Sequence, residues 1–248
     1  MKYARDRKIT STHTAEVLIE AFPWIKNATG KTILIKYGGA AMVDPKLRNA
    51  VMSDIVMLKI MGVNGTDAGT IIAEQASPDL GRVGKVVEVN PSYINALIAA
   101  DYVPIIASVG KGTDDGSFNI NADVAACAVA SAIGAHKIIF LTDVDGYYED
   151  FSDKGSLISQ MTVSETKQML AEGKVSSGMI PKLQSCIEAI EGGVPRAHIV
   201  NGTKPHSILV ELLTSSGAGT LIYDDDAEFS KDEMRPLGIL ASRLSENL

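Results

Sequence analysis

The sequence is poor in aromatic residues, in cysteine and in long apolar runs. Aromatic residues make up 5% of the chain, and the two cysteines, Cys127 and Cys186, lie far apart without CxxC or Cys/His spacing. We therefore expect two reduced thiols in the core and neither a disulfide nor a zinc site. No apolar run approaches the length of about 20 residues that crosses a membrane, and the N-terminus has no apolar segment followed by a cleavage site. These absences predict a cytoplasmic protein without a membrane partner.

Positive charge is also scarce. The chain has 23 Lys and Arg against 30 Asp and Glu, which gives a formal net charge of −7. An acidic balance disfavours nucleic acid as the main partner, although it is compatible with a local basic pocket for phosphate. What the chain does have is 248 residues, 46% of them hydrophobic, which suffices for one large or two small domains with a core.

Strand-like and helix-like segments alternate along the chain, which predicts an α/β fold with a largely parallel, buried sheet. The expected helices are residues 14–28, 46–61, 91–100, 121–135, 163–172, 178–193 and 206–214. The expected strands are residues 32–37, 82–89, 103–108, 136–144, 196–200 and 219–222. An acidic stretch follows residue 223, so residues 224–248 are expected to form a tail.

The first candidate site is IKYGG at residues 35–39, where a strand-like run ends in two glycines. Glycines let the backbone approach a ligand closely, and consecutive N–H groups can bind an anion. Lys36 would place a cation beside Gly38 and Gly39. Taken alone, the segment is equally well explained as a tight turn after a strand.

Three further segments place polar groups at the ends of expected elements. NINAD at residues 119–123 precedes an Ala-rich helix, and although Asn and Asp are good N-caps, three polar side chains exceed what a cap needs. LTDVDG at residues 141–146 ends a strand, where ligands of open α/β sheets bind, or it is an ordinary Asp-Gly turn. SGMIPK at residues 177–182 starts a helix and carries Lys182, which fits a phosphate site or a surface lysine.

These segments occur in one order, with GRVGKVVEVNP before NINAD and HIVNGTKPHSILVELLTSSGAGT after SGMIPK. Together they closely resemble the acetylglutamate kinases of the amino-acid kinase family, enzymes of arginine biosynthesis, over about residues 13–222. The resemblance implies a three-layer αβα sandwich with a mainly parallel central sheet. It further implies an N-terminal amino-acid-binding and dimerisation lobe at residues 1–110 and a C-terminal ATP-binding lobe at residues 111–223.

The family's reaction transfers the γ-phosphoryl group of ATP to the side-chain carboxylate of N-acetyl-L-glutamate. A carboxylate with a pKa of about 4.3 is ionised at neutral pH, so catalysis requires positioning and charge stabilisation and no general base. By resemblance, Lys36 and Lys182 are catalytic and Asp123 places both, while Gly38, Gly39 and Asn119 contact the substrate. The residues expected to frame ATP are Thr142, Asp143, Gly146, Tyr147, Ser176, Gly178 and Met179. Mg²⁺ is expected to arrive with ATP, without a dedicated protein metal site.

Arginine-inhibited members of the family carry an extra N-terminal helix that joins dimers into a hexamer, and residues 13–28 resemble it. The residues that match the arginine-site pattern are His198, Gly202, Glu211 and Gly217. Glu211 is chemically suited to a guanidinium or α-amino group, although it could also face solvent on the helix at 206–214. The resemblance therefore implies feedback inhibition by arginine and a homo-oligomer with a dimer core.

The chain departs from the family pattern after Asn64. Family members continue there with a buried strand and an HGGGP-type loop, then a helix, a hairpin and an Arg-containing stretch. Here MGVN at residues 61–64 runs directly into GTDAGTIIAE at residues 65–74, which resembles a much later point. Several dozen residues are therefore absent from this chain, either by omission or by a genuine deletion. A deletion would leave strand backbone unpaired, so we predict poor folding or no kinase activity in that case.

Two alternatives to acetylglutamate kinase activity follow from that departure. One is a related acyl-aminoadipate kinase, because the absent segment carries much of the substrate selection. The other is a catalytically impaired arginine-binding or oligomer-forming protein, because the HGGGP-type loop is absent.

Overall fold

The computed structural model describes residues 19, 21–26, 28–38, 42, 44, 45, 47, 49, 51, 59–214 and 217–227. Its strands are β1 (Ile33–Lys36), β2 (Lys59–Asn64), β3 (Ile71–Gln75), β4 (Val83–Val89), β5 (Tyr102–Ala107), β6 (Val109–Gly112), β7 (Ser117–Ile120), β8 (Lys137–Thr142), β9 (Tyr147–Tyr148), β10 (Leu157–Ile158), β11 (Gln160–Thr162), β12 (Arg196–Asn201) and β13 (Thr220–Tyr223). Its α-helices are α3 (Ser92–Ala99), α4 (Ala122–Ala132), α5 (Val163–Ala171), α6 (Ile180–Glu191) and α7 (Ser207–Leu213).

A five-stranded sheet in the order β1-β8-β12-β13-β11 forms the centre of the C-terminal half. β1 and β12 both pair with β8 in parallel, and β11 pairs with β13 in parallel. Only the β12–β13 pair is antiparallel within this sheet. The prediction of a mainly parallel central sheet is confirmed.

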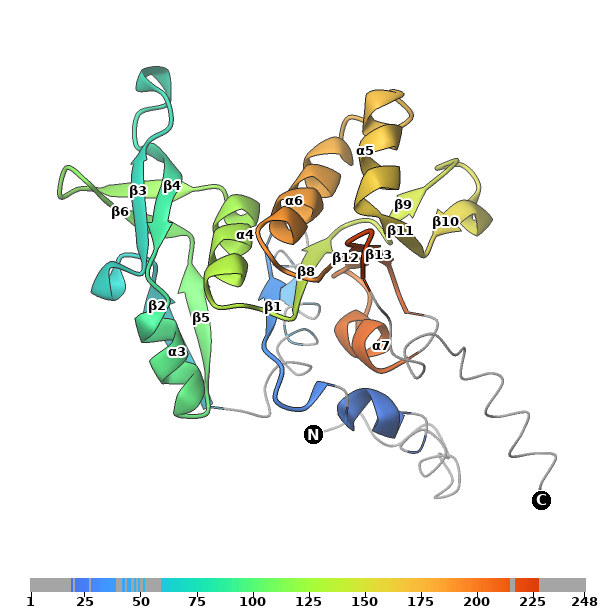
Figure 1. Cartoon of the computed structure of the whole chain (residues 1–248), viewed down its shortest axis with the longest axis horizontal. Coiled ribbons are helices and arrows are strands. Elements are labelled where there is room, and N and C mark those ends of the chain that lie inside the picture. Colours follow the sequence, from blue (N-terminus) through green and yellow to red (C-terminus); the bar gives the residue numbers. More distant parts are fainter. Residues whose placement is uncertain are drawn as a thin grey trace.

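The residues of β8 explain why helices cover both faces of this sheet. Ile138 and Phe140 lie in a core cluster with residues of α4 and α6, whereas Ile139 and Leu141 lie in a second cluster with Ile208 of α7. Successive side chains of a strand point to opposite faces, and all four of these β8 side chains are buried. Figure 1 shows the resulting arrangement, with α6 and α7 on opposite sides of the sheet. The three-layer αβα prediction agrees with it.

Residues 59–120 form a unit beside this sheet (Figure 1). β3, β4, β7 and β6 close a small barrel, whose core includes Ile71, Phe118 and Ile120. β2 and β5 pair in parallel as a separate two-stranded sheet. Two of its large apolar side chains, Ile60 and Ile105, are 39% and 44% exposed. β9 and β10 pair as another two-stranded sheet, so the described strands are divided among three sheets and a barrel.

The predicted helix at residues 46–61 is wrong at its end. Residues 45, 47, 49 and 51 are helical, but residues 59–61 belong to β2. β2 is specified by residue-by-residue pairing with β5, from Lys59 opposite Tyr102 to Asn64 opposite Ala107. Such a long-range contact leaves no mark on the local hydrophobic period. β3, β6 and β7, which form most of the barrel, were not predicted either.

The predicted lobe boundary at residues 110/111 falls inside β6, which pairs with both β3 and β7. A boundary after Ile120 would keep the barrel whole. Residues 19, 21–26 and 28 are helical, in agreement with the predicted helix at 14–28, and the tail beyond residue 227 lies outside the described residues. None of the helices in the described residues is both long and apolar enough to span a bilayer.

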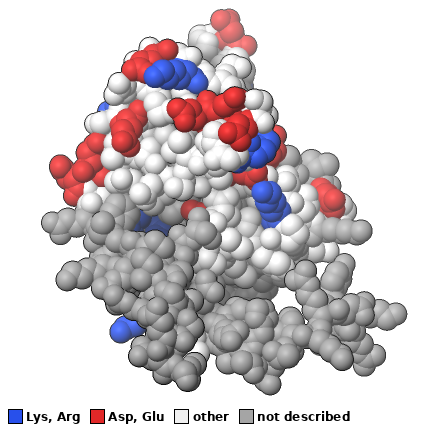
Figure 2. Space-filling view, turned by 90° about the vertical axis from the view of Figure 1, so that its right-hand side faces the viewer, with Lys and Arg blue, Asp and Glu red and all other residues white. Residues whose placement is uncertain are grey.

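One face of the molecule can be read for charge. The face that carries α5, β9 and β10 displays acidic side chains with fewer basic ones between them (Figure 2). Exposed acids that adjoin these elements in the sequence include Glu149, Asp150 and Glu172. Such a distribution repels a phosphate backbone over this described part of the surface.

Candidate active site

The candidate site begins at the carboxyl edge of the central sheet. β1, β8 and β12 are parallel neighbours, so they end side by side at Lys36, Thr142 and Asn201. Ligands of open α/β sheets bind outside these strand ends. The segments IKYGG and LTDVDG, which are far apart in the sequence, therefore meet at one edge.

Lys36 and Asp123 form an ion pair at this edge. The distance between Lys36 Nζ and Asp123 Oδ1 is 2.8 Å, and the two side chains are 16% and 28% exposed. Asp123 is fixed in the first turn of α4, where the Asn121 side chain caps the helix by accepting from Asp123 N at 2.8 Å. A Cβ placed on Gly38 would lie 3.8 Å from Lys36 Nζ, so the ammonium group lies beside the Gly38 backbone. Gly39 lies outside the described residues.

Lys182 projects from the start of α6. Its Nζ donates to Gly178 O at 3.1 Å, and no ion pair of the described residues joins it to Asp123. α4 precedes β8 and α6 precedes β12, and because these two strands are parallel, the two helices run in the same direction. The helices are in contact where Cys127 Sγ donates to Ser185 O at 3.3 Å. Asp123 lies one turn before that contact and Lys182 nearly one turn before it. Both side chains therefore project at the same end of the helix layer.

The turn after β8 is pinned at both its ends. At its start, Thr142 Oγ1 donates to Val144 O at 3.0 Å and accepts from Val144 N at 3.1 Å. At its end, Tyr147 N donates to Thr220 Oγ1 at 2.8 Å. Gly146 is required there, because a Cβ would lie 2.4 Å from Thr220 Oγ1.

The other residues predicted to bind nucleotide or substrate lie in different surroundings. Asp143, Ser176 and Gly178 are exposed, as is Asn119 on β7. Met179 is buried in the core. Tyr147 is buried in the same core cluster, so its ring supports the turn from inside.

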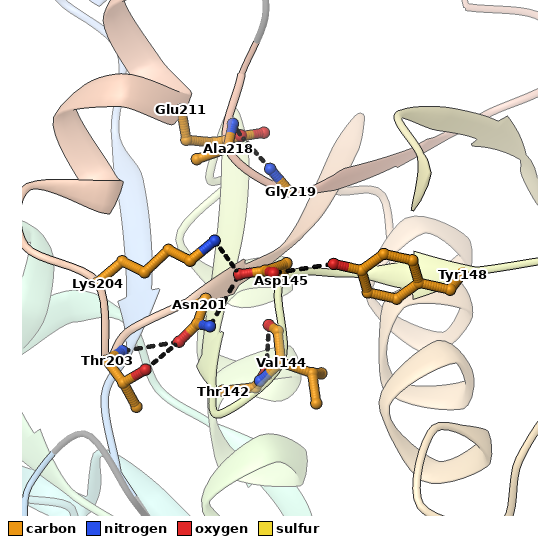
Figure 3. A network of polar contacts seen from close by, with 10 residues as sticks. All are labelled: Thr142, Val144, Asp145, Tyr148, Asn201, Thr203, Lys204, Glu211, Ala218 and Gly219. Carbon is orange, nitrogen blue, oxygen red and sulfur yellow. Dashed lines mark hydrogen bonds and ion pairs between the residues drawn. The ribbon is translucent and has the colours of Figure 1, made fainter. Parts of the chain in front are cut away.

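Five residues near this edge were missed by sequence reasoning, and they form one network (Figure 3). Asp145 Oδ1 accepts from Asn201 Nδ2 at 2.8 Å and lies 2.6 Å from Lys204 Nζ, while Asp145 Oδ2 accepts from Tyr148 OH at 2.8 Å. Asn201 Oδ1 in turn accepts from Thr203 N and Thr203 Oγ1 at 2.9 and 2.6 Å. Their one sequence signal was position, since Asp145 lies within LTDVDG and Asn201 follows a predicted strand.

The network holds the Asp145 carboxyl in its ionised form. Burial alone would raise its pKa, but hydrogen bonds from Lys204, Asn201 and Tyr148 lower the pKa to about 2. The carboxylate therefore keeps its charge throughout the physiological range.

The predicted arginine-site residues divide into two groups. His198, Glu211 and Gly217 come together below β12, where His198 Nδ1 lies 2.5 Å from Glu211 Oε1 and a Cβ on Gly217 would lie 2.9 Å from Glu211 Oε2. Glu211 Oε2 also accepts from Ala218 N at 2.6 Å (Figure 3). Gly202 lies apart from them, since its N–H extends the β8–β12 pairing to Thr142 O.

The solvent-facing alternative for Glu211 is wrong, because both side chains of the His198–Glu211 pair are 5% exposed. Burial would raise the pKa of the Glu211 carboxyl, but hydrogen bonds from His198 and from the backbone of Ala218 and Gly219 lower it. Burial lowers the pKa of the His198 imidazole despite the opposing effect of Glu211. These directions describe a neutral imidazole that donates its Nδ1 proton to an ionised carboxylate.

A small pocket lies between the N-terminal helical residues and α7. The residues that line it are Trp24, Ala28, Lys31, Ile33, His136, Lys137 and Leu212. Elsewhere among the described residues, no group of three or more His, Cys, Asp or Glu is arranged to hold a metal ion.

Comparison with known proteins adds independent findings. Residues 59–201 match the sequence model of the amino acid kinase family. The acetylglutamate kinase of Caldanaerobacter subterraneus subsp. tengcongensis is 37% identical over 284 residues, which cover 86% of this chain and 95% of that protein. The acetylglutamate kinase of Bifidobacterium longum is 36% identical over 287 residues, which cover 86% of this chain and 93% of that protein.

Solved structures share the fold at lower identity. N-acetylglutamate synthase from Neisseria gonorrhoeae, complexed with coenzyme A and N-acetyl-glutamate, superposes with a TM-score of 0.74 at 19% identity, over 94% of this chain and 70% of that chain. Giardia carbamate kinase superposes with a TM-score of 0.53 at 16% identity, over 89% and 94% of the two chains.

The alignment lengths bear on the departure after Asn64. The alignment with the Caldanaerobacter enzyme spans 284 positions, whereas 86% of 248 residues is about 213 residues. The difference, 284 minus 213, leaves about 71 positions of the relative without a counterpart in this chain. This supports the expectation that several dozen residues are absent.

Proposed function

The chain belongs to the acetylglutamate kinases of the amino acid kinase family, and from this premise we propose that it transfers the γ-phosphoryl group of ATP to the side-chain carboxylate of N-acetyl-L-glutamate, in arginine biosynthesis. The observation that carries the proposal is the Lys36–Asp123 pair, 2.8 Å apart at the carboxyl edge of the sheet. The pair puts a held ammonium group beside the Gly38 backbone. Mg²⁺ would accompany ATP.

The chemistry needs cations on both sides of the transferred group. Donor and acceptor are both anions, so the ammonium groups of Lys36 and Lys182 would offset their repulsion and the charge of the phosphoryl group in transit. Asp123 would keep Lys36 in place between turnovers. Lys182 donates to Gly178 O, and replacing that bond by one to phosphate would bring its charge to the nucleotide.

The test replaces each lysine by methionine. In Lys36→Met and in Lys182→Met we expect kcat to fall by about 10²-fold or more, with a smaller change in the KM for ATP, because the lost interaction forms mainly in the transition state. Lys85→Met is the matched control, since Lys85 pairs with Glu74 on the exposed side of the barrel. An unchanged kcat in both active-site variants contradicts the assignment.

Feedback inhibition by arginine forms a second part of the proposal. The support is the pocket whose lining includes Trp24, Lys31 and Lys137. Lysine ammonium groups could bind the α-carboxylate of arginine, and the indole ring could bind its guanidinium group. In the same proposal, the protein is a cytoplasmic homo-oligomer with a dimer core, and the N-terminal helix extends it to a hexamer.

Calorimetric titration of the folded protein with L-arginine tests this part. We expect saturable binding that weakens about tenfold in Trp24→Ala, because a cation–π contact contributes roughly 0.5–2 kcal/mol. L-lysine serves as the control titrant. Absence of heat with both ligands counts against arginine sensitivity and leaves the kinase proposal standing.

A second candidate function rests on the absent positions. About 71 positions of the Caldanaerobacter relative, 284 minus 213, have no counterpart here, so the chain could bind ligands without turnover. ADP binding without phosphoryl transfer to N-acetylglutamate or to an acyl-aminoadipate would favour this candidate. Transfer to the aminoadipate substrate alone would favour the related kinase.

A further inference from the structure

The turn between β8 and β9 is held at its middle by a single side chain. Thr142 fixes the start of the turn and Thr220 fixes its end, through Gly146 and Tyr147. Between them, Asp145 reaches the loop after β12 through Asn201 and Lys204. That loop connects β12 to α7, so one carboxylate ties together two neighbouring strand ends of the candidate site.

The polar groups around Asp145 are already used within the network. One carboxylate oxygen receives Asn201 and Lys204, and the other receives Tyr148. The side-chain oxygen of Asn201 accepts two hydrogen bonds, from N and Oγ1 of Thr203, and these fix the orientation of the amide group. A carboxylate with three donors is better suited to holding its neighbours than to binding a ligand itself, and Figure 3 shows these donors converging on it from different segments.

We propose that Asp145 is a positioning residue for nucleotide binding, which holds the Thr142–Gly146 turn and the Lys204 side chain in the arrangement that receives ATP. The proposal rests on the proposed kinase function, because that function puts the nucleotide at this edge. Asp143, the exposed residue of the turn, lies within this segment, two positions before Asp145. Small displacements of such contacts weaken binding strongly, since the ligand must then order the turn itself.

The experiment measures ADP binding by calorimetry, which reports the Kd and the number of sites separately and does not require turnover. Asp145→Asn keeps the shape of the side chain but removes its charge and one acceptor. We expect its Kd for ADP to rise about tenfold with an unchanged number of sites. Tyr148→Phe, which removes one donor, should give a smaller rise and serves as the milder variant if Asp145→Asn folds poorly.

Two further variants separate positioning from other roles. Asp150→Asn is the matched control, because Asp150 is an exposed carboxylate nearby in the sequence that accepts from Ser152. Its Kd should equal that of the unaltered chain. Lys204→Met combined with Asp145→Asn should raise the Kd no further than Asp145→Asn alone, because both act through one network.

Each remaining outcome overturns the proposal in an identifiable way. Unaltered ADP affinity in Asp145→Asn overturns it while leaving the proposed kinase function intact. A smaller number of ADP-binding sites with an unchanged Kd shows that Asp145 contributes only to the stability of the fold. Additive effects of the two substitutions show that Lys204 contacts the nucleotide independently of Asp145. Absence of ADP binding by the unaltered chain removes the nucleotide site itself, and with it both this proposal and the proposed function.

Discussion

At the residue scale, the buried His198–Glu211 pair shows how environment decides what a side chain does. Both residues matched a ligand-binding pattern in the sequence, yet both are 5% exposed and bonded to each other. Glu211 also accepts from the backbone N–H groups of Ala218 and Gly219, at 2.6 and 3.1 Å. The carboxylate therefore links α7 to the start of β13, whatever further role it has.

This pair predicts acid sensitivity in two ranges of pH. The pKa of His198 is lower in the folded chain than in the unfolded chain. As the pH falls below about 6.5, the unfolded chain therefore takes up a proton at this position first. The stability contributed by the neutral imidazole is lost as the pH falls from there through the pKa of the folded chain. The pKa of Glu211 is also lowered, so its contribution is present above about pH 4.3 and is lost below it.

Urea unfolding of the unaltered chain and of His198→Gln, measured between about pH 7.5 and 5, checks the first range. The unaltered chain should lose more free energy of unfolding over this interval than the variant, which cannot titrate at that position. Parallel curves would show that His198 does not carry the effect.

At the scale of elements, the cap predicted within NINAD agrees with the structure, and α5 has a cap that was not predicted. Asn121, within NINAD, caps α4 as the simpler interpretation of that segment required. α5 begins with a capping box, in which Thr162 Oγ1 accepts from Glu165 N at 3.1 Å and Glu165 Oε2 accepts from Thr162 N at 2.7 Å. Such contacts involve residues three apart, so a sequence can specify them directly.

The capping box of α5 provides a stability prediction. Thr162→Ala removes the acceptor for Glu165 N and should lower the free energy of unfolding by about 1 kcal/mol. Thr162→Ser retains the hydroxyl group and should lower it much less. Chemical denaturation of the three proteins decides between them, and equal losses in both variants would show that the lost methyl packing, and not the cap, is responsible.

At the scale of the whole molecule, the division of the strands is the feature that most affects function. β1 is an edge strand of the central sheet, and β5 pairs with β2 in a sheet of its own. We expected the absent segment to contribute a strand to the middle of the sheet, and its loss to leave neighbouring strands without partners. The separate β2–β5 pair and the exposed Ile60 and Ile105 are consistent with that expectation.

Restoring the absent segment should therefore restore a single sheet. We predict that insertion of the corresponding residues of the Caldanaerobacter enzyme between Asn64 and Gly65 raises the melting temperature and the rate of N-acetylglutamate phosphorylation. A Gly/Ser insert of equal length is the control, because it lengthens the chain without adding a strand. Thermal unfolding and a coupled assay of ADP release measure the two effects. If the enzyme-derived segment raises neither the melting temperature nor the rate of phosphorylation, then the absent residues belong at another position or are not needed.

Most of the fold and part of the site could be predicted from the sequence. The helices later observed as α3, α4, α5 and α6 have their apolar residues at helical spacing, and the strand β8 is a short apolar run, so local pattern was sufficient. Lys36 and Asp123 were predicted to meet only through family resemblance, since they lie 87 positions apart and no local rule connects them. The barrel was missed because its strands, of which β6 and β7 have four residues each, gain their partners only on closure.

The sequence by itself determined the family, through the order of its segments along the chain. It also determined the cap of α4 and the strand ends that carry lysine, glycine and aspartate, because these depend on neighbours a few residues away. Only the tertiary structure decided that residues 59–64 form a strand, that Glu211 is buried, and that Asp145 connects two strand ends. The physical reason is the same in each case. Pairing, burial and ion-pair formation depend on groups 13 to 59 positions away, which come into contact only when the chain has folded.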